Sequence, residues 1–381
     1  MIIGDIKHLV NNNLSVDNWK IRHTDKENED LVETFDGKAT IEETDKYKYL
    51  GFLLSNRGDN MINIKEMRKK SIWVTNKIFN RLNSLNLNQY FFECGLIFLN
   101  VILRSTILYA AETYYNIKEN ELRMLERIEE QFLRKLLKTG RGCPVSQLYL
   151  KTGHIPARFA VMKLRCLFLK TILDENTESL IYRFVMTQYE NPIKGDWMSS
   201  CLRDLKYLNI SLTIENIKAM KKNHFKRKLK ESIENKALQY LLDKRGSKGI
   251  QIKYSSLKMA EYLLPNHEKL SISEQRYIFA IRNRMVQIEN NFPNQMSKSP
   301  CICGEFENQE HIYSCTLLNQ NKEIIEYDRI FEENVKAQKK IYERFKENLE
   351  IRNEKTRKIS HPSDPSGRST VITKPSCNSN G

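Results

Sequence analysis

Hydrophobic and polar positions alternate along most of this chain with the period of an α-helix. From about residue 60 onward, apolar residues return every three or four positions, and this spacing predicts a helix wherever it persists. In the first segment the predicted apolar face consists of Ile64, Met67, Trp73, Val74, Ile78, Phe79 and Leu82. We therefore expect a mainly α protein, with helices over 60–85, 90–115, 118–138, 159–173, 271–290 and 322–356.

The residues before position 60 show a different pattern, which is typical of short strands. Residues 32–41 predict a hairpin around Asp36-Gly37, because this dipeptide suits the positive φ angles of a tight turn. Residues 44–55 then predict a single strand. A short β segment should therefore precede the helices.

Breaks in the helical pattern divide the chain into parts. Glycines and a proline interrupt it at 140–144, since glycine is poor in helix interiors and proline donates no hydrogen bond. The final residues are rich in Pro, Ser and Gly, which predicts disorder. The expected parts are a β segment, a helical bundle, a helical connector, a cysteine-rich knuckle, a charged helix and a disordered tail, over 1–58, 59–175, 176–295, 296–320, 321–358 and 359–381.

The charge of the chain favours a polyanionic partner. There are 62 Lys and Arg against 47 Asp and Glu, which gives a formal net charge of +15. Each phosphate that a cation neutralises releases condensed counterions, so basic clusters bind nucleic acid. The alternative for each cluster is a solvated helix face, and the segment 221–230 is equally compatible with a nuclear localisation signal. The candidate clusters contain Lys65, Arg68, Lys69 and Lys70, and further along Lys226, Arg227 and Lys228.

The apolar runs and the scattered cysteines indicate the cellular compartment in which we expect the protein. The chain turns polar within its first five residues, which does not suit a secretory leader. The longest apolar run, 90–111, contains Glu93 and Arg104, and ionisable groups are costly at mid-membrane depth, so we expect a buried core helix there. Isolated cysteines do not form a disulfide framework. We expect an intracellular protein, nuclear or cytoplasmic, with no membrane partner and no small-molecule substrate.

A stretch rich in cysteine and histidine carries the clearest chemistry. Cys301 and Cys303 are one residue apart, and His311 and Cys315 follow at the spacing of one helical turn. Three thiolates and an imidazole suit tetrahedral Zn²⁺, and Gly304 permits a tight turn beside the first pair. We therefore predict a structural zinc site. The alternative is three unconnected buried cysteines and a surface histidine, because one intervening residue is fewer than the usual two to four, roughly, of a zinc knuckle.

Four stretches follow one another along the chain: 47–51 (YKYLG), 108–114 (LYAAETY), 132–137 (FLRKLL) and the cysteine and histidine cluster. Taken in order, they resemble the reverse transcriptases of non-LTR (LINE-type) retrotransposons, C-terminal to their polymerase active site. Residues 47–51 (YKYLG) look like the primer-grip strand. Residues 108–114 (LYAAETY) are similar to the family's Leu-Tyr-Gly-x-Glu-x-Trp helix in the thumb, and 132–137 to the basic end of the next helix. The cysteine and histidine cluster, after an arginine-rich helix, resembles the zinc knuckle that follows the thumb. The resemblance covers most of residues 1–320.

The resemblance implies a palm-end and primer-grip remnant over 1–58 and a thumb-like bundle over 59–175. It implies RNA and DNA as partners, bound through their backbones. Tyr47 and Tyr49 would support the primer end, although aromatic residues in a strand also serve packing. The cations of the helix over 60–85 would lie along the primer–template duplex, and the helix before the knuckle would add Arg276, Arg282 and Arg284.

The chain departs from this family where the chemistry takes place. The family copies RNA into DNA with aspartates that hold two divalent metals, and its hallmark is an Asp-Asp dipeptide. This chain contains no Asp-Asp dipeptide. We therefore assign no catalytic residue and expect no polymerase activity. Mg²⁺ would act only in the full-length polymerase.

Three functions remain open from the sequence. The first is a fragment of a retrotransposon reverse transcriptase that retains the nucleic-acid-binding thumb and knuckle. The second is a non-catalytic nucleic-acid-binding protein of the host. The third is a scaffold in which the helix over 322–356 pairs with a protein partner along a thin apolar stripe of Ile325, Ile330, Phe331, Ile341 and Phe345.

Overall fold

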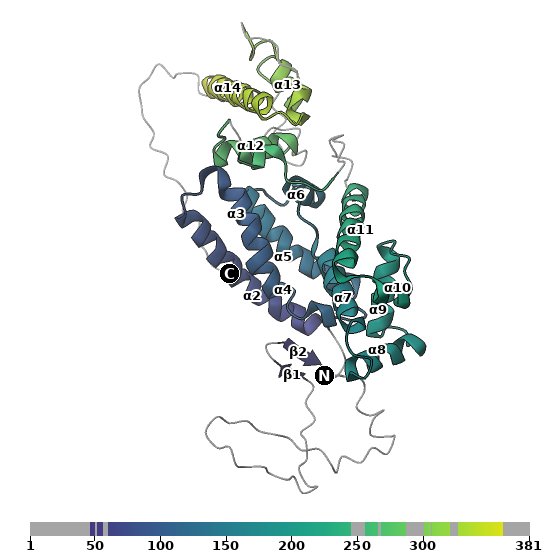
Figure 1. Cartoon of the computed structure of the whole chain (residues 1–381). Helices are drawn as coiled ribbons and strands as arrows, with labels where there is room; N and C mark the ends of the chain where they lie inside the picture. The colour runs from purple at the N-terminus through teal and green to yellow at the C-terminus, as the bar shows by residue number, and fades with distance from the viewer. Residues whose placement is uncertain are drawn as a thin grey trace. The chain divides into compact units, whose positions relative to one another are not determined.

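Helices dominate the part of the chain that the structure describes, which confirms the mainly α class (Figure 1). The hairpin expected around Asp36-Gly37 and the tail expected beyond residue 360 lie outside it. This computed structural model describes residues 46–49, 52–55, 60–244, 256–265, 268–286, 301–305, 307–320 and 327–360.

The described residues before position 60 form two strands rather than the single strand expected over 44–55. Strands β1 (Lys46–Tyr49) and β2 (Phe52–Ser55) pair antiparallel, with Tyr49 opposite Phe52. The reversal between β1 and β2 was not expected from the sequence pattern.

Two compact units make up the chain, and they cut across the parts expected from the sequence. Unit 1 takes in Met1–Asn86, Cys94–Leu133 and His154–Lys244, and unit 2 takes in Leu87–Glu93, Arg134–Gly153 and Arg245–Gly381. Besides β1 and β2, the elements of unit 1 are α2 (Asn60–Ser84), α3 (Phe91–Phe98, in unit 1 from Cys94), η2 (Leu99–Leu103), α4 (Arg104–Ile107), η3 (Ala111–Thr113), α5 (Glu119–Leu137, in unit 1 to Leu133), α7 (Ala157–Leu173), α8 (Leu180–Glu190), α9 (Trp197–Tyr207), α10 (Ile214–Ala219) and α11 (Lys222–Asp243).

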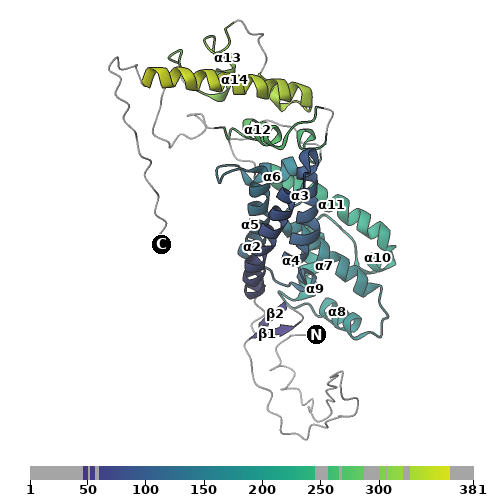
Figure 2. The same cartoon turned by 90° about the vertical axis from the view of Figure 1, so that its left-hand side faces the viewer.

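Helix α7 forms the centre of unit 1. Its buried residues include Phe159, Val161, Cys166 and Leu169, and it packs against each of α8, α9, α10 and α11. The sequence boundary expected at residue 175 is therefore not a boundary in the packing. Helices α2, α4 and α5 lie side by side in both views, with the rings of Phe79 and Phe132 5.1 Å apart (Figures 1 and 2).

A buried chain of polar side chains ties these helices together. The Nδ2 of Asn63 donates to the Tyr114 hydroxyl at 2.8 Å, and the backbone oxygen of Tyr114 accepts from Arg165 Nη1 at 2.5 Å. Arg165 Nε then donates to Asp204 Oδ2 at 2.7 Å. Burial raises the pKa of Tyr114 to about 12, and it also raises the pKa of Asp204 although Arg165 opposes that shift. This network connects α2, the segment after α4, α7 and α9.

The helix expected over 90–115 is broken and only partly buried. Its regular part ends at Ile107, after the π-helical turn η2. Within the described residues one stretch, Asn88–Ile107, is long and apolar enough to cross a membrane, and 33% of its most apolar window is buried. Leu99 and Leu103 are fully buried, whereas Ile97 and Val101 are 50% and 65% exposed. The expected core helix is therefore buried along one face only.

Unit 2 contains the cysteine cluster and the last long helix. Its elements are η1 (Asn88–Tyr90), the first residues of α3, the end of α5, α6 (Val145–Thr152), η4 (Glu261–Leu263), α12 (Ile272–Arg282), α13 (Gln309–Ser314), η6 (Tyr327–Phe331) and α14 (Val335–Ser360). A capping box begins α12: the Ser271 hydroxyl accepts from the backbone N–H of Glu274, whose carboxylate accepts from the backbone N–H of Ser271. Helix α12 ends at Arg282, earlier than the expected residue 290.

The apolar stripe of α14 is used inside unit 2. Ile341 and Phe345 are fully buried, and Phe345 packs against the rings of Tyr277 in α12 and Tyr313 in α13. Ile330 is also fully buried, so these three positions of the expected stripe are covered within unit 2, whereas Ile325 lies outside the described residues. The helix also begins at Val335 rather than at residue 322.

Candidate metal centre and candidate nucleic-acid interface

The first two cysteines of the cluster lie in a tight turn. The backbone N–H of Gly304 donates to the oxygen of Cys301 at 2.7 Å, and the N–H of Cys301 donates to the oxygen of Glu305 at 2.9 Å. Gly304 has a φ of +88°, a left-handed value that favours glycine. The glycine thus closes the turn that presents Cys301 and Cys303 together.

The other two candidate ligands come from a short helix. Asn308 caps α13 by accepting from the backbone N–H of His311 at 2.5 Å, and Cys315 follows the last helical residue. Two side-chain bonds hold α13 against α14: the Tyr313 hydroxyl donates to the Ile341 oxygen at 2.6 Å, and Asn348 Nδ2 donates to the Ile312 oxygen at 3.0 Å.

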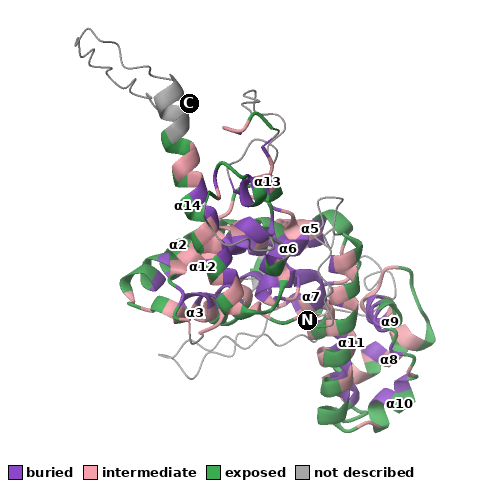
Figure 3. Cartoon of the chain, turned by 90° about the horizontal axis from the view of Figure 1, so that it is seen from above, coloured by how far each residue is buried: buried purple, intermediate pink, exposed green. Residues whose placement is uncertain are grey.

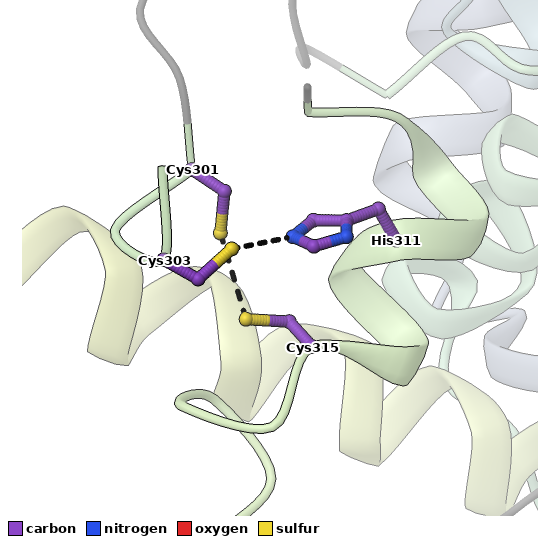
Figure 4. A group of neighbouring side chains, drawn as sticks. All are labelled: Cys301, Cys303, His311 and Cys315. Atoms are coloured by element: carbon purple, nitrogen blue, oxygen red, sulfur yellow. Dashed lines mark hydrogen bonds between the residues drawn. The ribbon is translucent and has the colours of Figure 1, made fainter. Parts of the chain in front are cut away.

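The four side chains point toward one another (Figure 4). One ligand atom from each lies within 4.8 Å of every other, so the group can hold a metal ion. The sulfurs of Cys301 and Cys315 are 3.6 Å apart, and Cys303 Sγ lies 3.1 Å from His311 Nε2. The structure therefore brings together all four residues that the sequence spacing selected.

The surroundings of the cluster suit metal ligation. His311 Nδ1 lies 3.2 Å from the Glu305 carboxylate, an arrangement that orients a ligating imidazole and leaves Nε2 for a metal. Glu305 was not identified from the sequence as a partner of His311, although it directly follows Gly304. Burial, with the neighbouring Cys315 thiol, raises the pKa of Cys301 to about 12. A bound cation would favour the thiolate form of the Cys301 sulfur.

The exposed side of α2 is the strongest candidate for contact with nucleic acid. Helix α2 contains six Lys and Arg and a single carboxylate, Glu66, which lies 3.9 Å from Lys69. Exposed positions recur along it every three or four residues. Figure 3 colours the described residues of every helix by their burial. We call this surface the α2 stripe, and its residues are Lys65, Arg68, Lys69, Ile72, Trp73, Asn76, Lys77, Asn80 and Arg81.

Two assignments on α2 change with the structure. Trp73 was expected on the apolar face, but 60% of its surface is exposed. At about 100° per residue Trp73 lies roughly half a turn away from buried Ile64, so the helical period could have placed it correctly. Lys70, one of the four cations selected on this helix, is half-buried beside the stripe.

The basic segment of α11 does not form a single face. Lys226 and Arg227 are exposed, whereas Lys228 is half-buried. Consecutive residues of a helix point about 100° apart, so these three cations point in different directions around α11. The side chains of Tyr47 and Tyr49 lie outside the described residues.

The three arginines expected before the knuckle are engaged within unit 2. Arg282 is 3% exposed, donates to the backbone oxygens of residues 331 and 332, and lies 5.3 Å from the ring of Tyr262. Arg276 donates twice to the Leu136 oxygen, and Arg284 pairs with Glu310 at 2.9 Å. Arg282 is therefore no candidate for phosphate contact, because its guanidinium is buried against other protein groups.

Comparisons of the chain with protein-family models, with curated proteins and with solved structures find no match. The resemblance to reverse transcriptases therefore rests on the motifs alone.

Proposed function

We propose that this protein is a non-catalytic, intracellular nucleic-acid-binding chain that corresponds to the thumb and knuckle portion of a non-LTR retrotransposon reverse transcriptase. The observation that carries the proposal is the α2 stripe, which has five exposed cations on one side of one helix. Clustered cations on one helix bind phosphates without reading base sequence. The chain would therefore bind RNA and DNA through their backbones.

One backbone detail supports the family assignment. In the segment 108–114, Ala110 stands where the family motif has glycine, and its φ is +55°. Alanine rarely adopts this left-handed conformation, which glycine enters at little cost. Tyr114 stands at the motif's tryptophan and is fully buried. The glycine and the tryptophan of the family motif would therefore suit the left-handed backbone at position 110 and the buried site at position 114.

Replacing Ala110 with Gly is expected to stabilise the protein. An alanine in the left-handed conformation destabilises the folded state by about 1–2 kcal/mol. Glycine avoids this cost, but it loses up to about 1 kcal/mol of stability because its unfolded chain has more conformational freedom. We expect an increase of about 0.5–1 kcal/mol in the free energy of unfolding, measured by urea denaturation. The control is Ala219→Gly in α10, an exposed alanine without positive φ, which should be destabilising. A loss of stability in Ala110→Gly would count against the strained backbone.

The metal that fits the cluster is Zn²⁺ in a structural role. Ideal tetrahedral ligation with Zn–S bonds of about 2.3 Å separates two sulfurs by about 3.8 Å. The Cys301–Cys315 separation of 3.6 Å is close to this value. Three sulfurs and one imidazole would complete a closed coordination shell, which is typical of structural rather than catalytic zinc. The ion would join the 301–305 turn to α13.

A salt titration tests the proposed function. We expect affinity for a labelled oligonucleotide to fall steeply with salt concentration, because binding releases counterions. The triple variant Lys65→Gln, Arg68→Gln, Lys69→Gln should bind at least about tenfold more weakly at low salt and reduce the log–log slope by about two to three. Filter binding at several salt concentrations gives both quantities.

The matched control removes three exposed cations of unit 1 that lie off α2: Lys163→Gln, Arg183→Gln, Lys206→Gln. It changes the net charge equally, so it should lose much less affinity than the α2 variant. A flat salt dependence of the unmodified protein would refute the proposed function. If both triple variants lost the same affinity, binding would depend on the net charge of the protein and not on α2.

A further inference from the structure

An exposed aromatic residue lies in the middle of the basic surface of α2. Trp73 is 60% exposed, and its neighbour Ile72 is 58% exposed. The ammonium of Lys77 lies 3.6 Å from the centroid of the Trp73 ring. One face of the indole is thus covered by a cation, and the large exposed fraction leaves further ring surface accessible.

The flanking charges narrow the choice of ligand for this ring. Lys69 precedes Trp73 by four residues and Lys77 follows it by four, so each lies about 6 Å away along the helix axis. A neutral apolar partner would have to cover these ammonium groups at a desolvation cost. A ligand that carries an aromatic face and adjacent negative charges satisfies the ring and both cations together.

We propose that Trp73 stacks an unpaired base of a single-stranded nucleic acid, while the cations on either side contact the phosphates next to that base. This inference rests on the proposed function and specifies its ligand. Surfaces that bind single strands combine a basic track with aromatic stacking platforms, since every base has a π-face. Paired bases inside a duplex are stacked on one another and do not offer that face.

A comparison of single-stranded and duplex oligonucleotides tests the proposal. Fluorescence anisotropy is measured with one labelled strand, alone and annealed as a blunt duplex. Trp73→Ala should weaken single-strand binding by about five- to hundredfold, in line with the loss of one stacked base, and duplex binding less than about twofold. Trp73→Phe should keep most of the affinity because an aromatic face remains.

Leu180→Ala is the control, because Leu180 is 76% exposed and lies on α8 rather than on the stripe. It should leave both affinities unchanged. If Trp73→Ala lost equal affinity for the single strand and the duplex, or lost none for either, base stacking would be overturned. The proposed contacts of the α2 cations with phosphates would not be affected by that result. Absence of any salt-dependent binding by the unmodified protein would instead refute the proposed function, and this inference with it.

Discussion

Replacing Cys303 with Ser is expected to abolish tight zinc binding and to unfold the segment around residues 301–320. A serine hydroxyl is a poor zinc ligand, and the three remaining groups do not close the shell. Helix α13 has six residues, too few to be stable by itself. Ligation energy in structural zinc peptides amounts to about 10–16 kcal/mol and is also folding energy, so its loss should be decisive for this segment.

Two measurements check this expectation. Metal analysis of the purified protein should find about one equivalent of zinc, and none in the variant. Hydrogen exchange should show lost protection at the amides of Ile312 and Cys315, which bond to Asn308 and His311, while α7 remains protected. Cys94→Ser removes a cysteine outside the cluster and should keep its zinc. A variant at Cys303 that retains both its zinc and its protection would contradict the metal assignment.

Replacing Asp204 with Ala is expected to destabilise unit 1 by about 3–5 kcal/mol. The side chain of Arg165 is 2% exposed, and its Nε donates to Asp204 at 2.7 Å. Removing the carboxylate leaves a buried guanidinium without its counter-charge, which costs more than the ion pair itself is worth. Urea denaturation monitored by circular dichroism gives the change in unfolding free energy.

Two further variants distinguish this cause from a general loss of packing. The double variant Arg165→Met, Asp204→Leu removes both charges and should recover most of the stability. Glu234→Ala breaks the exposed pair with Lys230 and should cost at most about 1 kcal/mol. If the double variant were as unstable as Asp204→Ala, the buried charge would not be the reason for the loss.

Local sequence signals predicted several of the helices and the cysteine cluster. Apolar residues three or four positions apart identified α2, α5 and α7, because one helical face contacts the core. The spacing of His311 and Cys315 placed both on one side of a helix, and Gly304 marked the turn beside the first pair. These features depend on neighbours within a few residues, which the sequence displays directly.

The partners of charged side chains could not be predicted in the same way. Arg158 was not selected, yet it is buried and donates to Glu126 and Glu119 of α5, thirty-two and thirty-nine positions away. Arg282 was selected as a phosphate contact and is buried instead. A cation that faces solvent and a cation that is buried beside a residue distant in the sequence have the same local sequence pattern. Only the tertiary packing distinguishes them.

The length of the α2 stripe limits how much of a polymer one molecule can occupy. From Lys65 to Arg81 the helix rises about 24 Å, which matches about seven nucleotides at stacked spacing. An oligomer much shorter than this would leave one end of the helix without phosphates. On a long strand, neighbouring molecules would need at least that many nucleotides each, which sets an upper bound on the density of a saturated filament.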